Sequence, residues 1–126
     1  MELKEINSLV ELFFDKFEQL SLVNDKNIKN TFLVSLKEKN KNSKLFSYSW
    51  EITNAKITFL SNYLKNIISE GDRCILLSEN RPEWLISDIA IMNSGGVTVP
   101  LFTTYSKNDY KYIINDCEPK VCIVSN

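Results

Sequence analysis

The first third of the chain shows one helical period followed by two short strand-like runs. Ser8 and Glu11 form the pattern of a capping box, which predicts the start of a helix that ends near Leu20. The apolar residues of this helix recur at positions i, i+3, i+4 and i+7 and define one face: Val10, Phe13, Phe14 and Phe17. Segments 31–37 and 45–48 then favour the two strands of a hairpin.

The segment 38–44 that would connect these strands is polar and contains Lys39, Lys41 and Lys44. These lysines have two interpretations, a basic patch that binds phosphates or a solvated loop. No aromatic residue or glycine lies between the charges, which favours the solvated loop.

The longest apolar pattern follows Ser49, a good N-cap residue, with Glu51 in the first turn facing the helix dipole. Its apolar positions form a continuous stripe that we expect to be buried: Ile52, Ala55, Phe59, Leu60, Tyr63, Leu64, Ile67 and Ile68. Gly71 is expected to end this helix, because glycine readily adopts the left-handed conformation after a last turn.

Short apolar runs and helical patterns alternate in the second half of the chain. The run 73–78 is typical of a strand covered on both faces, and the runs 97–99 and 121–124 predict two further strands. Pro82 marks the start of one intervening helix, and the capping pair Ser106 and Asp109 marks the start of another. This alternation predicts a parallel sheet with right-handed crossovers.

The expected fold class is therefore α/β. An N-terminal helix and β-hairpin, residues 1–47, precede a β-α-β-α-β parallel-sheet unit, residues 48–126. The apolar run 121–124 has no covering helix after it, so we expect residues 1–126 to be an incomplete part of a larger domain.

Composition and charge exclude several classes of partner and catalytic site. The chain has 44% hydrophobic and 25% charged residues, as ordinary globular proteins do. Its 15 basic and 16 acidic residues give a net charge of -1, which offers no electrostatic reason to expect a nucleic-acid partner. The absence of histidine excludes a histidine-based zinc site or a Ser-His-Asp triad within these residues.

The three cysteines, Cys74, Cys117 and Cys122, form no C-x-x-C pair. Cys74 and Cys122 lie in apolar runs, so we expect reduced, buried thiols in a reducing compartment. The chain shows no secretory signal, and no apolar run approaches the roughly 20 residues that span a bilayer. We therefore expect a cytoplasmic protein, with contact to a membrane surface left open.

Few residues offer chemistry of their own. No glycine lies between Gly71 and Gly95, so the glycine-rich turn of a dinucleotide-binding domain is absent. Three carboxylates, Glu79, Glu83 and Asp88, lie close in sequence, but no companion acid or lysine follows at the later strand ends.

Two further features lie near expected strand ends. Thr103 and Thr104 follow a strand at the edge where α/β proteins bind ligands, so they either face a substrate or belong to a turn. Trp84 is either a partner anchor or a core residue.

Several short sequence words stand in a specific order between Tyr48 and Ser125. They are Ser49-Trp50, 71–73 (Gly-Asp-Arg), 78–84 (Ser-Glu-Asn-Arg-Pro-Glu-Trp), 95–101 (Gly-Gly-Val-Thr-Val-Pro-Leu) and 103–106 (Thr-Thr-Tyr-Ser). In this order and spacing, the sequence resembles the N-terminal part of AMP-forming acyl-CoA synthetases of the adenylate-forming superfamily. It is nearest to the long-chain fatty-acid branch, and the residues before Tyr48 match more loosely.

The resemblance implies part of the large N-terminal domain of an acid–thiol ligase. Such an enzyme uses ATP and Mg²⁺ to convert a fatty acid to an acyl-adenylate and then transfers the acyl group to coenzyme A. The family's phosphate loop, ribose-binding aspartate, magnesium-binding acid and mobile C-terminal lysine have no counterpart in residues 1–126. We therefore assign no catalytic, cofactor-binding or metal-binding residue and expect this segment to act as a scaffold, inactive alone.

Two other interpretations stay open at this point. The β-α-β-α-β pattern would also suit a stand-alone, flavodoxin-like regulatory or interaction module without catalysis. A relative that activates amino acids, or one similar to luciferases, would share the same sequence words. The acyl chain length and the oligomeric state cannot be read from these residues.

Overall fold

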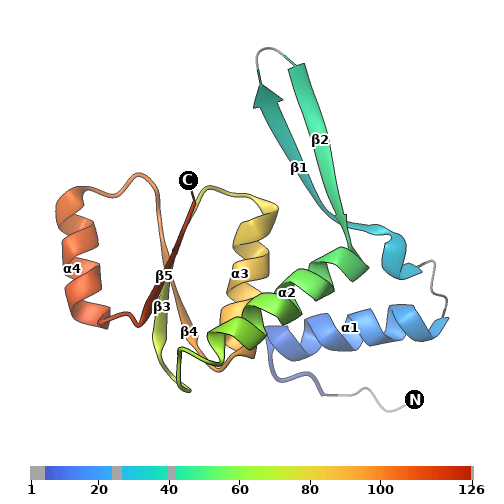
Figure 1. Ribbon diagram of the computed structural model, residues 1–126, viewed down its shortest axis with the longest axis horizontal. Coiled ribbons are helices and arrows are strands. Elements are labelled where there is room, and N and C mark those ends of the chain that lie inside the picture. The colour runs from blue at the N-terminus through green and yellow to red at the C-terminus, as the bar shows by residue number, and fades with distance from the viewer. Residues whose placement is uncertain (1–4, 24–26, 40–41, 126) are drawn as a thin grey trace. The chain divides into compact units, whose positions relative to one another are not determined.

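Two compact units make up the structure, a computed structural model that describes residues 5–23, 27–39 and 42–125 (Figure 1). The first unit is Met1–Lys56 and the second is Ile57–Asn126. The first contains a helix and a hairpin, and the second contains a parallel sheet with its helices.

The first helix, α1 (Leu9–Val23), starts where the sequence predicts and continues past Leu20. Ser8 Oγ accepts a hydrogen bond from the Glu11 amide at 3.0 Å, which confirms the cap. The Glu11 carboxylate accepts from the amide of Asn7, at 3.0 Å, one residue before the position that a capping box predicts. Phe13 is buried, so the expected apolar face is confirmed at its centre.

The hairpin is longer than the sequence suggested. After the short 3-10 helix η1 (Asn27–Lys29), β1 (Thr31–Lys39) pairs antiparallel with β2 (Asn42–Ser49). Most of the predicted connection 38–44 therefore belongs to the strands, because backbone pairing continues through polar positions that periodicity does not detect. Lys41 lies outside the described residues.

Aromatic side chains tie the first unit together. The ring centroids of Phe32 and Trp50 lie 3.9 Å apart, and the Phe13 ring stacks on Trp50 at 5.6 Å. Phe32 lies in β1, Trp50 begins helix α2 (Trp50–Leu64) and Phe13 lies in α1, so one cluster joins the hairpin to both helices. A two-stranded hairpin is marginal by itself and needs such an anchor.

Helix α2 (Trp50–Leu64) begins as predicted, with Ser49 Oγ accepting from the Ile52 amide at 3.1 Å. The prediction of its buried stripe is largely wrong. Leu64 and Ile68 are buried, and five predicted core positions are exposed: Ile52, Ala55, Phe59, Tyr63 and Ile67. The helix also ends at Leu64, before the turn that leads to Gly71.

The buried face of α2 instead includes two hydroxyl residues, Thr53 and Ser61, beside Ile57. Ser61 Oγ accepts a hydrogen bond of 2.8 Å from the side-chain amide of Asn93, so this polar group has a partner in the core. By hydrophobicity alone, Ser61 would be expected to face solvent. The predicted buried face of α2 is therefore rotated about the helix axis relative to the observed one.

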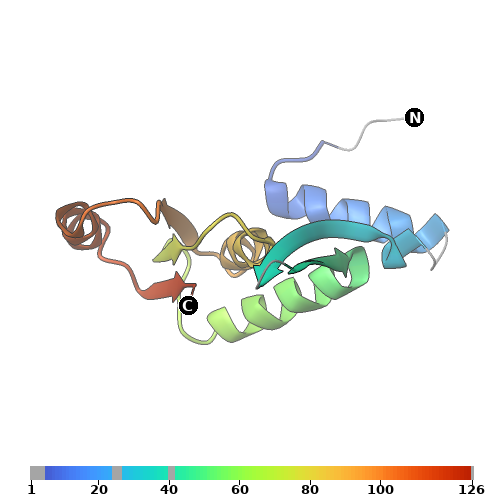
Figure 2. The same cartoon turned by 90° about the horizontal axis from the view of Figure 1, so that it is seen from above.

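The second unit confirms the β-α-β-α-β prediction. Its elements are β3 (Arg73–Leu77), α3 (Pro82–Asn93), β4 (Val97–Leu101), α4 (Lys107–Cys117) and β5 (Val121–Val124). The strands form a parallel sheet in the order β4-β3-β5. Figures 1 and 2 show α3 and α4 on opposite faces of this sheet.

Strand β4 extends beyond its predicted end at Pro100 to Leu101. Within the described residues β4 pairs only with β3, so it is an edge strand, where a proline is tolerated. Strand β5 is covered less than expected, because its residues alternate between half-buried and exposed. Cys122 is therefore exposed, contrary to the buried thiol predicted, whereas Cys74 is buried.

Helix α4 is held mainly at its ends. Its predicted face is only half-buried at Tyr110, Ile113 and Cys117, and Ile114 is 43% exposed. Arg73 Nε donates to the carbonyl oxygen of Cys117 at 2.7 Å, so a cation from β3 satisfies the negative end of the helix.

Gly96 marks a close approach between α3 and the segment after α2. A Cβ atom at this position would lie 2.9 Å from Ile68 Cδ1 and 3.0 Å from Ile91 Cγ2. Both neighbours are buried, so they have little room to move.

We predict that Gly96→Ala destabilises the second unit by about 1–3 kcal/mol, the usual cost of overpacking a close-packed core. Amide hydrogen exchange of β3 and α3 should accelerate accordingly. Asn115→Ala, at an exposed position of α4, serves as the control and should change stability by less than about 0.5 kcal/mol. Equal exchange rates in the two variants would contradict the close approach.

Candidate functional site

The connections of the parallel sheet define where a ligand can bind. The chain leaves β3 toward α3 on one face and leaves β4 toward α4 on the opposite face (Figure 2). The carboxyl ends of β3 and β4 are therefore a topological switch point. In open α/β sheets, ligands bind in the crevice at such a point.

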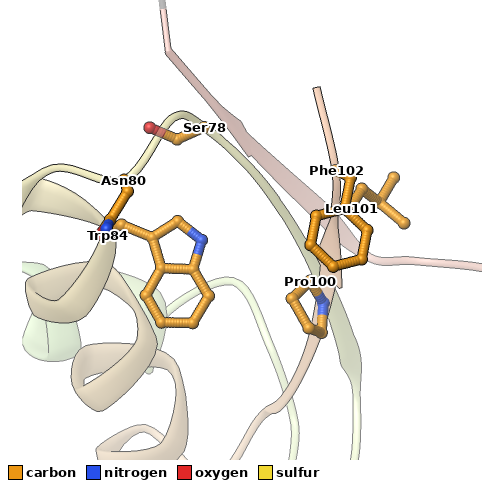
Figure 3. A pocket seen from close by; sticks show the side chains of 6 residues that line it. All are labelled: Ser78, Asn80, Trp84, Pro100, Leu101 and Phe102. Carbon is orange, nitrogen blue, oxygen red and sulfur yellow. The ribbon is translucent and has the colours of Figure 1, made fainter. Parts of the chain in front are cut away.

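A cavity of about 310 Å³ occupies this position. Its lining residues come from the segment after β3, from α3 and from the end of β4: Ser78, Asn80, Trp84, Pro100, Leu101 and Phe102. Figure 3 shows the indole ring of Trp84 on one wall, with the rings of Pro100 and Phe102 on the opposite wall. The volume lies at the lower end of the range for small-molecule sites.

The lining of this cavity is uncharged. Four of the six residues are apolar or aromatic, and Ser78 and Asn80 contribute a hydroxyl and an amide. None of these side chains titrates near neutral pH, so the cavity offers binding surface and hydrogen bonds without acid–base chemistry. Its lining suits an uncharged, largely apolar group.

The rim that carries Phe102 is held by one hydrogen bond from α4 and one from the loop before α4. Tyr110 Oη donates to the carbonyl oxygen of Phe102 at 2.8 Å, and the amide of Tyr105 donates to the same oxygen at 3.2 Å. Their rings also lie close together, with centroids of Phe102 and Tyr105 5.4 Å apart and of Tyr105 and Tyr110 6.1 Å apart. The rim is therefore positioned by the first turn of α4.

The start of α4 is itself fixed by the predicted capping box, which is confirmed. The Asp109 carboxylate accepts from the Ser106 hydroxyl at 2.7 Å and from the Ser106 amide at 2.9 Å. These bonds, the hydroxyl first, hold the pKa of Asp109 below its usual value. The carboxylate therefore stays ionised at neutral pH and keeps the cap in place.

The acidic residues singled out from the sequence do not form a common site. Glu83 pairs with Arg81 at 3.0 Å, and Asp88 is half-buried farther along α3. Glu79 is exposed, and its pKa is lowered by its own backbone amide and then by the Ser125 hydroxyl. Within the part of the chain that the structure describes, no three metal-ligating side chains cluster.

The other candidate residues from the sequence differ in whether they line the cavity. Trp84 is half-buried and lines the cavity. Thr103 and Thr104 are exposed and lie outside the set of lining residues. Sequence reasoning missed Phe102, Pro100 and Leu101, although their position at the carboxyl end of a strand next to β3 could have indicated them.

Comparison with known proteins decides the family. The model of the AMP-binding enzyme family matches residues 25–126. The chain belongs to the AMP-binding enzyme family. The resemblance seen in the sequence words is thereby confirmed, and no comparison supports the stand-alone regulatory module.

Relatives within the family include fatty acyl-CoA synthetases. The chain is 41% identical over 56 residues to fatty acyl-CoA synthetase A of Dictyostelium discoideum, covering 44% of this chain and 8% of that protein. It is 26% identical to the structure of a Mycobacterium tuberculosis fatty acyl CoA synthetase, with a TM-score of 0.59, covering 63% of this chain and 16% of the other.

A broader match confirms the fold. The four-domain nonribosomal peptide synthetase AB3403, bound to AMP and glycine, aligns over 95% of this chain and 8% of its own, with a TM-score of 0.75 and 21% identity. At this identity the match shows the fold alone. The chain spans 8% or 9% of the length of its first curated relatives.

We predict that Tyr110→Phe loosens the cavity rim, because it removes the hydroxyl that bonds the Phe102 carbonyl. Hydrogen exchange in residues 102–106 should accelerate, with a loss of stability of about 0.5–1.5 kcal/mol. The control is Tyr112→Phe on the same helix, where the tyrosine is 70% exposed. A similar change in both variants would show that the hydroxyl of Tyr110 does not position the rim.

Proposed function

We propose that the complete protein is a long-chain fatty acid–CoA ligase of the AMP-forming type. The carboxylate of a fatty acid attacks the α-phosphorus of ATP, which forms an acyl-adenylate and releases pyrophosphate. The thiol of coenzyme A then attacks the acyl carbon, which forms the thioester and releases AMP. The observation that carries this proposal is the family match over residues 25–126, together with relatives named as fatty acyl-CoA synthetases.

Within that enzyme, we propose that residues 1–126 are part of the large N-terminal domain and serve as scaffold. The six residues around the cavity include no basic side chain and no carboxylate, so they do not fit a triphosphate or Mg²⁺. We therefore propose that no residue of this segment takes part in a chemical step of the reaction. The uncharged cavity at the switch point fits an apolar portion of a substrate instead.

The location of the complete protein is also part of the proposal. Among the described residues, no helix is long and apolar enough to cross a membrane. We propose that the complete protein is a cytoplasmic enzyme.

The complete protein should catalyse fatty-acid-dependent exchange of labelled pyrophosphate into ATP. Exchange is expected because adenylate formation is reversible and precedes the use of coenzyme A. The assay should include fatty acids of several chain lengths and, as a comparison, free amino acids. Exchange with amino acids but with no fatty acid would replace the proposed substrate class with that of an amino-acid-activating relative.

Residues 1–126 alone should show no exchange under the same conditions. The family's nucleotide-binding motifs have no counterpart in this segment, so the adenylating site is not assembled from it. Exchange by the isolated segment would contradict the scaffold role, even if the complete protein behaves as proposed.

A further inference from the structure

The two helices on opposite faces of the parallel sheet are packed very differently. Helix α3 contributes six buried residues: Pro82, Ile86, Ser87, Ile89, Ala90 and Ile91. Helix α4 contributes none, and its least exposed residues, Tyr110, Ile113 and Cys117, are only half-buried. A segment with little buried apolar surface opens at a lower free energy than the core does. Burial therefore holds α4 against the sheet much less firmly than it holds α3.

The start of α4 and the cavity rim are hydrogen-bonded to each other. The Tyr110 hydroxyl donates to the carbonyl oxygen of Phe102 at 2.8 Å, and the Ser106 hydroxyl donates to the Asp109 carboxylate at 2.7 Å. The ring contact of Phe102 with Tyr105 lies inside the same segment. Because none of these contacts has to break when the segment shifts, residues 102–117 can move as one body.

One side chain from the sheet holds the far end of this body. Arg73, the first residue of β3, donates from Nε to the carbonyl oxygen of Cys117 at 2.7 Å and from Nη2 to that of Glu118 at 3.5 Å. Glu118 has a φ of 44°, a left-handed conformation that costs free energy in a residue with a Cβ atom. A strained residue held in place by its surroundings is suited to act as a hinge.

We propose that residues 102–117 form a lid over the switch-point cavity and that Arg73 is the latch of this lid. With Arg73 bonded, Phe102 forms the wall opposite Trp84 (Figure 3). When these bonds break, the lid swings about its ends, beside the buried Leu101 and at Glu118, and carries Phe102 away from the cavity. Phe102 is 68% exposed, so its movement uncovers little apolar surface. The proposal goes beyond the ligase reaction and does not depend on it.

Unravelling of α4 would be another way to open the cavity, and the hydrogen bonds disfavour it. The capping box satisfies the start of the helix, and the amide of Glu118 donates to the carbonyl oxygen of Ile114 at its end, at 3.0 Å. Neither set of bonds involves the side chain of Arg73. Loss of that side chain therefore leaves the helix intact but no longer fixes its position.

Two side chains report the movement in the complete protein. Cys117 is half-buried at the end of the lid, and the exposed Cys122 on β5 serves as an internal reference. Their rates of alkylation by iodoacetamide, measured for each peptide by mass spectrometry, report release of the lid. Quenching of Trp84 fluorescence by acrylamide reports access to the cavity. The Trp84 signal is obtained as the difference from Trp84→Phe.

Arg73→Gln removes the latch and should accelerate alkylation of Cys117 by up to about tenfold, the factor that loss of a charge-assisted hydrogen bond corresponds to. Quenching of Trp84 should increase as well, although Arg73 begins β3 and Trp84 lies beyond the opposite end of that strand. Alkylation of Cys122 should not change. Arg73→Lys keeps a charged donor and should restore most of the protection.

Glu118→Gly tests the hinge in the opposite direction. Glycine adopts the left-handed conformation without the Cβ penalty, so the closed lid is no longer strained at this position. Alkylation of Cys117 should slow by about fivefold. The control is Lys111→Gln, which removes a positive charge from an exposed position of α4 and should change neither reporter.

Several outcomes would overturn the proposal. Equal alkylation of Cys117 in the unaltered protein and in Arg73→Gln would exclude the latch, and faster alkylation without greater quenching of Trp84 would separate α4 from the cavity. Amide exchange in residues 110–117 that accelerates together with alkylation would show unravelling instead of a swing. If Arg73→Gln also makes the buried Cys74 reactive, the sheet itself has loosened, and the result for Glu118→Gly then decides.

Discussion

Burial of β3 between two parallel neighbours is the constraint on which the rest of the second unit depends. Cys74, Ile75 and Leu76 are almost completely buried, and the strand is hydrogen-bonded along both edges. A strand in this position must be apolar on both faces. It therefore requires cover on both sides of the sheet, which the elements that follow β3 and β4 provide from opposite directions.

The site follows from the same arrangement. Because the two connections diverge, side chains after β3 and at the end of β4 face each other across a gap that neither helix fills. Trp84 and Phe102 reach this gap from elements separated by a full strand, and Tyr110 fixes the rim. Five of the six lining residues belong to the sequence words 78–84 and 95–101, and the order of the strands brings these two words together.

The two units contribute different kinds of surface to an AMP-binding enzyme. The second unit carries an uncharged cavity at the carboxyl edge of its sheet, whereas the hairpin of the first carries exposed aliphatic residues, among them Leu36 and Leu45. Of the lysines that the sequence places in a solvated loop or a phosphate-binding patch, Lys39 and Lys44 lie in the paired strands β1 and β2.

Local chemistry determined much of this protein from the sequence alone. The caps at Ser8, Ser49 and Ser106, the proline at the start of α3 and the alternating parallel unit all depend on residues close in sequence, so they could be predicted. The ordered sequence words likewise identified the family. Cavity residues such as Phe102 were not identified, because they meet others only through strand order.

Tertiary structure decided which face of each element is buried. Ser61 lies in the core because Asn93, distant in sequence, supplies its hydrogen bond, and this turns Phe59 and Tyr63 to the surface. Cys122 is exposed because β5 is covered on one side only. The hydrophobic periodicity of an element indicates which of its residues share a face. Whether that face is buried depends on the segments, distant in sequence, that pack against it in the folded protein.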